Sequence, residues 1–235
     1  VLSYLCRVHT IEANENKDQP EKGYSKQIKG SVTTYKFMVS TANPIATNTG
    51  YKVLRSGGSA IDAVVAIQMV LNVVEPQSSG IGGGAFILYW DAKTKQLYSF
   101  DGRETAPKSL NSNYFITSDG RKKSFWEAVQ GGGSVGVPGT LRLMEFVHQR
   151  YGIVDWSELF QPAIRLARDG FLVSPRLAKS ISGAQKRGLD NFPATRAYFF
   201  NEDLTPKLAN SRLSNKPLAE TFDLISKGGA NVFYE

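Results

Sequence analysis

A glycine-rich loop lies between two apolar segments of different character, and this order limits how the chain can fold. The loop covers residues 78–85 and contains four glycines. The segment before it, residues 59–74, has the length and apolar composition of a buried helix, and residues 85–90 after it are typical of a strand. A glycine loop that holds a nucleotide phosphate instead follows a strand and opens a helix. We therefore expect no nucleotide site here, and interpret the glycines as a tight loop, a close backbone approach or a positive φ.

Length and composition allow a large core and argue against two classes of partner. The 235 residues, of which 41% are hydrophobic, are enough for one domain or two small ones. Polar residues interrupt the longest apolar run, so no run reaches the ~18 residues that cross a bilayer, and we expect no membrane span. The net charge of +7 comes from dispersed Lys and Arg, with Arg121–Lys123 as the one tight cluster. Because no recognition helix or stacking-aromatic pattern accompanies this charge, we expect no nucleic-acid partner.

Cysteine and histidine are too scarce for several kinds of site. The single cysteine, Cys6, excludes an internal disulfide and a cysteine-based zinc site. His9 and His148 are far apart in the sequence and offer little from which to build a metal site or a Ser-His-Asp triad. We predict no metal and no cofactor, and we place His148 on the surface of a helix within residues 141–151.

The chain divides into a polar arm and a domain. Residues 1–34 are polar and lack periodicity, so we interpret them as an arm or linker, and residues 35–235 as the domain. In the domain, Asn43 followed by Pro44 predicts a helix start, and Gly57–Gly58 predicts its end.

Further helices and one hairpin follow the first helix. Ser59 and Asp62 have capping-box spacing at the start of the apolar helix. Residues 85–90 and 97–100, joined by a polar turn, predict a β-hairpin. Helices packed on a sheet place the chain in the α+β class. The later helices are predicted at residues 140–151, 157–168, 175–186 and 218–227.

An arginine follows the second predicted strand and is a candidate binding residue. Arg103 is flanked by Gly102 and, four residues on, by Pro107. A guanidinium held at a strand end can bind a carboxylate with two parallel hydrogen bonds. The alternative is a simple ion pair with Glu104 or another nearby acid, and these residues alone leave both open.

Several separated motifs, in this order, resemble γ-glutamyltransferases. The similarity extends over about residues 37 to 235 and is to the front part of the large, N-terminal subunit of that family. The motifs are residues 43–47, 57–63 and 75–84, the segment around Arg103, and residues 136–139 and 163–170.

The resemblance implies an N-terminal-nucleophile hydrolase fold, an αββα sandwich that is incomplete in this chain. Such a protein is made as one precursor and cut by autoproteolysis. The cut exposes a threonine whose hydroxyl attacks the γ-glutamyl carbonyl while its own α-amine serves as base. In the family this threonine begins the small subunit, which would lie downstream of residue 235. We therefore assign no catalytic residue here, treat Thr105 and Thr140 as structural, and expect residues 1–235 alone to be inactive.

The resemblance also implies substrate-binding roles. Arg103 matches the family arginine that binds the α-carboxylate of the γ-glutamyl group, and Glu104 is a weaker candidate that orients Arg103 or lines the pocket. The loop at residues 78–84 is expected to pack at the sheet interior near the active site.

The implied activity is γ-glutamyl transfer and hydrolysis on glutathione and related γ-glutamyl compounds, through a γ-glutamyl-enzyme ester. Water or an acceptor amino acid or peptide resolves this ester, and the small subunit from the same precursor is the protein partner. The expected location is periplasmic or extracellular. The alternatives are a related acylase acting on a cephalosporin side chain, a transpeptidase acting on poly-γ-glutamate, and a relative that keeps only a binding or assembly role.

Overall fold

A computed structural model of the chain describes residues 30–235. Most of the arm predicted at residues 1–34, with Cys6 and His9, lies outside the described residues, so the prediction of an arm remains a prediction. Contacts between residues divide the chain into two units, of which the larger is Thr34–Glu235.

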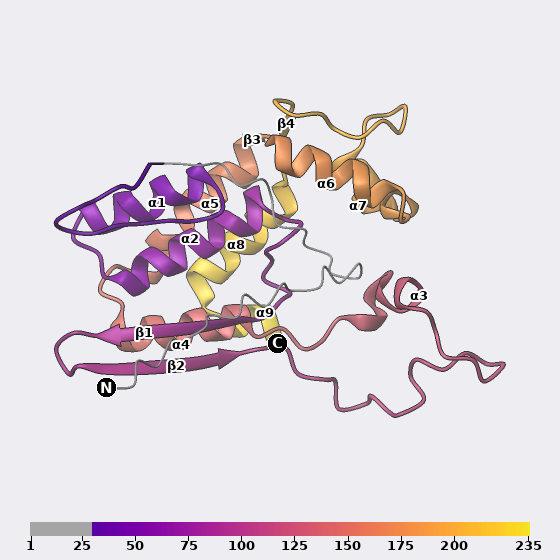
Figure 1. Cartoon of the computed structure of the whole chain (residues 1–235), viewed down its shortest axis with the longest axis horizontal. Coiled ribbons are helices and arrows are strands. Elements are labelled where there is room, and N and C mark those ends of the chain that lie inside the picture. The colour runs from indigo at the N-terminus through magenta and orange to yellow at the C-terminus, as the bar shows by residue number, and fades with distance from the viewer. Residues whose placement is uncertain (1–29) are drawn as a thin grey trace, which may run out of the picture. The chain divides into compact units, whose positions relative to one another are not determined.

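Four helices form the centre of the larger unit (Figure 1). Helix α2 packs against α1 and against α5, and α5 in turn packs against α8. A two-stranded antiparallel hairpin lies beside α4, which also contacts α2. The bounds of these elements are α1 Pro44–Arg55, α2 Ala60–Val74, β1 Ala85–Asp91, β2 Gln96–Gly102, α4 Thr140–Tyr151, α5 Trp156–Asp169 and α8 Lys216–Gly228.

The α+β class and the predicted helices are confirmed, with bounds that differ by at most two residues. The short elements were not predicted from the sequence, because segments of so few residues show no periodicity. They are α3 Phe125–Val129, η1 Gly132–Ser134, β3 Phe171–Leu172, η2 Leu189–Asn191, α7 Pro193–Phe199, β4 Arg212–Leu213 and α9 Asn231–Tyr234; α6, which was predicted, spans Pro175–Gln185.

Helices α1 and α2 begin where their capping residues predicted. The side chain of Asn43 accepts a hydrogen bond from the backbone N–H of Ile45 at 3.0 Å. Ser59 and Asp62 form a reciprocal capping box at the start of α2. Between the two helices Gly57 has a φ of 96°, a conformation that favours glycine and lets the chain reverse.

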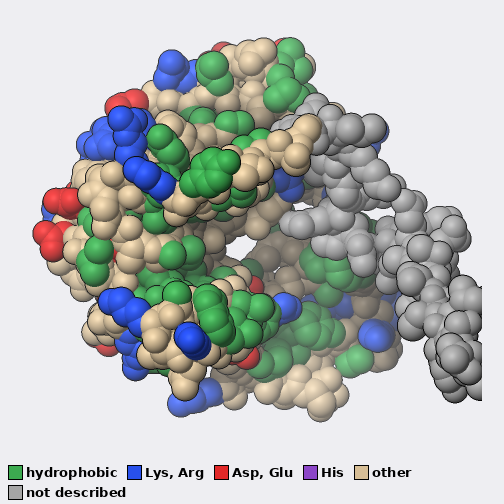
Figure 2. All heavy atoms as spheres, turned by 60° about the vertical axis from the view of Figure 1, so that its left-hand side comes forward, with side chains coloured by type: hydrophobic (Ala, Val, Ile, Leu, Met, Phe, Trp, Pro, Cys, Tyr) green, Lys and Arg blue, Asp and Glu red, His purple; other side chains and the backbone are tan. Residues whose placement is uncertain are grey.

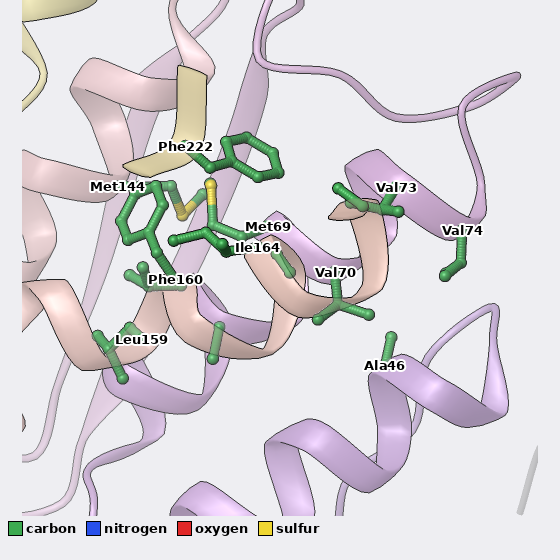
Figure 3. Packing of buried hydrophobic residues seen from close by; sticks show 14 of the residues in the cluster. Ala46, Met69, Val70, Val73, Val74, Met144, Leu159, Phe160, Ile164 and Phe222 are labelled. Atoms are coloured by element: carbon green, nitrogen blue, oxygen red, sulfur yellow. The ribbon is translucent and has the colours of Figure 1, made fainter. Parts of the chain in front are cut away.

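Helix α2 is apolar nearly all round because other helices cover it from two sides. Met69 lies among Phe160 and Ile164 of α5 and Phe222 of α8, whereas Ala46 of α1 faces the other side of α2 near Val70 (Figure 3). All of these side chains are buried. This cluster is the main core of the described residues. It fixes the position of the C-terminal end of α2, after which the glycine loop follows.

The hairpin buries one face and exposes the other. Residues Tyr89 and Phe100 pack on Tyr151 of α4, with ring centroids 4.6 and 6.2 Å from that of Tyr151. The register pairs Ala85 with Gly102 and Asp91 with Gln96. The opposite face carries exposed apolar side chains, which are Phe86, Leu88, Trp90 and Leu97.

The prediction that His148 lies on the helix surface is wrong. Only 14% of its side chain is exposed, and its Nε2 lies 2.8 Å from the carbonyl oxygen of Val154. The chain turns back over the ring directly after α4, and Trp156 packs against it with ring centroids 5.2 Å apart. The helical pattern could not reveal this cover, because it comes from the connection to the next helix.

Asp62 joins the start of α2 to the same connection. Its side chain is fully buried and accepts hydrogen bonds from the backbone N–H groups of Ser59 at 2.7 Å, Ile153 at 3.1 Å and Val154 at 3.4 Å. His148 Nε2 lies 3.6 Å from the same carboxylate. The capping residue of one helix therefore also holds the link between two others.

We expect Asp62→Ala in the complete protein to lower the free energy of unfolding by about 3 kcal/mol, because the backbone N–H groups of Ser59, Ile153 and Val154 lose a charged acceptor that is itself fully buried. The control Asp223→Ala removes a partly exposed pair with Lys227 one helical turn away and should cost only about 0.5 kcal/mol. Urea denaturation followed by circular dichroism measures both. Equal losses would contradict the anchoring role of Asp62.

Candidate functional site

Three segments far apart in the sequence meet where strand β2 ends. The carbonyl oxygen of Gly83 accepts hydrogen bonds from the backbone N–H groups of Gly139 at 2.9 Å and Thr140 at 3.0 Å. Thr105 and Val137 exchange a pair of backbone hydrogen bonds of 3.3 and 2.8 Å. The first glycine loop, residues 103–105 after β2, and residues 136–140, which we call the second glycine segment, are thus joined by backbone hydrogen bonds.

The glycines at this meeting point allow a close backbone approach. A Cβ atom at Gly84 would lie 2.8 Å from both the backbone nitrogen of Glu104 and the carbonyl oxygen of Gly102, and would overlap the Glu104 carboxylate. A Cβ at Gly136 would lie 2.9 Å from Glu104 Cβ, and one at Gly139 would overlap the Gly102 carbonyl. Real Cβ atoms do not occupy such positions, so these glycines are required by space.

Gly80 and Gly82 of the first loop are not required by space in this way. A Cβ at Gly80 would have its nearest neighbour at 3.9 Å, and one at Gly82 would meet nothing within 4 Å. No glycine of residues 80–84 has a positive φ. Of the three interpretations of this loop, close approach holds for Gly84, and the positive φ is wrong.

Arg103 and Glu104 form an exposed ion pair beside these glycines. Arg103 Nε lies 3.3 Å from Glu104 Oε2, and the two side chains are 70% and 33% exposed. The backbone N–H of Arg103 is bound to the Asp101 side chain at 2.8 Å, which fixes the backbone at this residue. The ion-pair alternative is therefore observed. An exposed pair of this kind contributes only about 0–1 kcal/mol, so it leaves the guanidinium available to another carboxylate.

A cavity of about 640 Å³ opens at the pair. Arg103 and Glu104 are the charged residues that line it, and residues that follow them in the chain form a wall of mixed character. This wall includes Leu110, Tyr114, Phe115 and Val135. The volume lies within the usual range for small-molecule sites. On the face drawn in Figure 2, Lys and Arg side chains lie at several places between apolar patches.

The lobe at residues 107–135 forms this wall and is held by its own polar contacts. Arg121 binds Glu127 with two hydrogen bonds of 3.0 and 2.9 Å, and Ser124 and Glu127 form a capping box at the start of α3. These contacts lower the pKa of Glu127 to about 2, with the hydrogen bond from Arg121 as the largest cause. Gln130 Nε2 donates to the carbonyl oxygen of Arg187 at 2.7 Å and so connects the lobe to the segment after α6.

A buried carboxylate at the end of α2, just before the first glycine loop, was not predicted from the sequence. Glu75 is 2% exposed and accepts hydrogen bonds from Asn43 at 2.8 Å, Gln77 at 2.6 Å and Arg176 of α6 at 3.0 Å. Arg176 also donates to Ser78 Oγ at 3.2 Å. The available signals were its place at the end of an apolar helix and within the motif at residues 75–84, whereas two of its partners, Asn43 and Arg176, come from distant segments. This network fixes where the loop leaves α2.

The two threonines that were treated as structural lie where the three segments meet, and Thr105 also lines the cavity. Thr140 is buried at the first position of α4, and its N–H binds the carbonyl oxygen of Gly83. Thr105 pairs with Val137 through its backbone. Within residues 30–235, no group of three or more His, Cys, Asp or Glu side chains is arranged to hold a metal ion. None of the helices in this part of the chain has the length and apolarity to cross a membrane.

Comparisons with known proteins agree with this architecture. The family model for gamma-glutamyltranspeptidase matches residues 46–235. The glutathione hydrolase proenzyme of Bacillus subtilis (strain 168) is 38% identical over 235 residues, which are 100% of this chain and 39% of that protein. The crystal structure of Helicobacter pylori gamma-glutamyltranspeptidase is 34% identical with a TM-score of 0.82, over 88% of this chain and 58% of that one.

A cephalosporin acylase structure from Bacillus halodurans is also similar, with 26% identity and a TM-score of 0.66 over 88% of this chain and 41% of that chain. The fold is thus part of an N-terminal-nucleophile hydrolase, and the described residues supply helices and two small antiparallel sheets of it, β1–β2 and β3–β4. The chain belongs to the gamma-glutamyltranspeptidase family. It spans about two-fifths of the length of the B. subtilis relative.

We expect the order of the lobe to depend on pH through Glu127. Its folded-state pKa of about 2 lies below the ordinary value of 4.5, so its stabilising contribution is present above pH 4.5 and is lost as the pH falls through about 2. Hydrogen exchange of the amides in residues 115–129 should accelerate, relative to the rest of the domain, over this range. Glu127→Gln should show the faster exchange already at pH 7. Identical exchange in the variant and the parent at pH 7 would contradict the assignment.

Proposed function

We propose that the complete protein transfers and hydrolyses the γ-glutamyl group of glutathione and related compounds. The observation that carries this proposal is the exposed guanidinium of Arg103 in the lining of the cavity, within a motif of the family to which the chain belongs. The planar guanidinium matches the two oxygens of an α-carboxylate. Glu104 orients the guanidinium through the ion pair and lines the cavity beside it.

In this proposal the reacting threonine lies outside residues 1–235, at the start of the small subunit. Its hydroxyl oxygen attacks the γ-carbonyl and forms an ester, while its α-amine takes the hydroxyl proton and passes a proton to the departing amine. Water or an acceptor amine then attacks the ester, which releases glutamate or a new γ-glutamyl compound and restores the hydroxyl. Arg103 holds the glutamyl part in place during both steps.

The related acylase remains the second candidate. The similarity to a cephalosporin acylase supports it, as does a cavity wall that carries Leu110, Tyr114 and Phe115 and suits an apolar group. Arg103 instead favours a substrate with a free α-carboxylate, and we therefore rank γ-glutamyl compounds first. A transpeptidase acting on poly-γ-glutamate and a relative with only a binding role are the remaining alternatives.

The exposed face of the hairpin suits the proposed small-subunit partner. Phe86, Leu88, Trp90 and Leu97 form an apolar surface on a sheet of only two described strands, and such a surface is normally covered. We propose that the second sheet of the sandwich covers it in the complete protein. A periplasmic or extracellular location is proposed from the family resemblance.

Arg103→Ala in the complete enzyme should raise KM for a γ-glutamyl anilide sharply. A lost charged contact to the substrate corresponds to about 2 to 5 kcal/mol of transition-state binding. Arg103→Lys keeps the charge without the two-pronged geometry and should fall between the parent and the alanine variant. Steady-state kinetics measures all three, and unchanged values for Arg103→Ala would refute the proposed contact.

Expression of the complete reading frame tests processing and association together. We expect denaturing gels and mass spectrometry to reveal two fragments, with a threonine at the new N-terminus and with activity that rises as cleavage proceeds. Leu88→Lys should weaken the association of the fragments in size-exclusion chromatography, because it places a charge in the proposed sheet interface. Lys93→Ala, in the hairpin turn, is the control. An uncut and inactive protein would favour the non-catalytic alternative.

A further inference from the structure

The Arg103–Glu104 pair is exposed, yet the backbone that carries it is in close contact with two glycine segments. At the first contact, a Cβ at Gly84 would meet the nitrogen of Glu104 at 2.8 Å and would overlap its carboxylate. At the second contact, a Cβ at Gly136 would lie 2.9 Å from Glu104 Cβ and 3.0 Å from the carbonyl oxygen of Thr105. Glu104 is therefore confined by two contacts that only glycine allows, and we call these two contacts the walls of a slot.

The two glycine segments that form the walls of the slot are each held in place by hydrogen bonds to residues outside the cavity. Before the first loop, Arg176 binds the buried Glu75 at the end of α2 and donates a further hydrogen bond to Ser78 of the loop. Near the other end of the loop, the carbonyl oxygen of Gly83 is bound by two N–H groups at the start of α4. The second segment is held where the hydroxyl of Tyr234 donates to the carbonyl oxygen of Pro138 at 2.8 Å.

We propose that Gly84 and Gly136 are positioning residues for substrate binding, because together they hold Glu104 and thereby aim the guanidinium of Arg103 into the cavity. This inference rests on the proposed role of Arg103 in binding an α-carboxylate. The ion pair alone holds Arg103 only weakly, since both side chains reach solvent. The rigid slot supplies the missing constraint, because a displacement of the Glu104 backbone at either wall moves the neighbouring arginine as well.

The two walls are expected to differ in how well they tolerate an added methyl group, and Gly84 should be the less tolerant position. At Gly84 an added methyl group meets backbone atoms of two residues, which cannot move aside independently. At Gly136 it meets the base of one side chain and one carbonyl oxygen at slightly longer distances. At Gly80, in the same loop, the nearest atom would be 3.9 Å away and φ is not positive, so Gly80→Ala is a matched control.

The test compares two substrates in the complete, processed enzyme. One is a γ-glutamyl anilide, and the other is the same anilide of 4-aminobutyrate, which keeps the amine and lacks the α-carboxylate. The value of kcat/KM for the γ-glutamyl anilide, divided by that for the 4-aminobutyrate anilide, measures recognition of the carboxylate. We expect Gly84→Ala to lower this ratio at least about tenfold, mainly through KM, because small misplacements of a binding group have effects of this order or larger. Gly136→Ala should lower it less, and Gly80→Ala should leave it unchanged.

A merely structural role predicts a different result, in which the variants lose activity on both substrates equally and the ratio stays constant. That outcome overturns the inference. If Gly84→Ala yields no folded protein, Gly136→Ala together with Glu104→Ala decides, since both must lower the ratio. Arg103→Ala in the same series separates the two proposals. An unchanged ratio for Arg103→Ala refutes the carboxylate contact itself, whereas a lowered ratio there with unchanged glycine variants refutes the slot alone.

Discussion

Burial of helix α2 is the constraint on which the rest of the described structure depends. Its apolar residues point in all directions, so the helix is stable only when other elements cover it on more than one side. Helix α1 covers one side, and α5 with α8 covers another. The two ends of α2 then take defined positions, with Asp62 fixing the link between α4 and α5 at one end and Glu75 fixing the glycine loop at the other.

The candidate site is built mainly from backbone, and this explains its sequence. Gly84, Gly136 and Gly139 surround residues 102–105 so closely that any side chain at these three positions would collide. Hydrogen bonds between backbone groups hold the segments together at Gly83, Thr105 and Val137, as expected where backbone segments lie close to one another. The charged side chains are thereby left free to face the cavity, where a ligand can compete for them.

The buried and exposed ion pairs of this chain have different physical roles. Glu75 is almost fully buried and has three donors, a condition under which a buried charge is tolerated and fixes its neighbours. Arg103 and Glu104 form a single exposed contact of 3.3 Å, which water screens. The first arrangement suits an anchor. The second suits a group that exchanges one carboxylate partner for another.

The sequence by itself determined the local structure. Asn43, Ser59 and Asp62 set the starts of α1 and α2, and the change of apolar period at the first glycine loop set the order of helix and strand, because caps and periodicity depend on residues a few positions apart. The motif around Arg103 also marked the candidate site through family resemblance. Only the tertiary structure decided that His148 is covered, that Glu75 is an anchor, and which glycines are needed for space. Those properties depend on contacts between segments far apart in the chain, and no local pattern records which segments will meet.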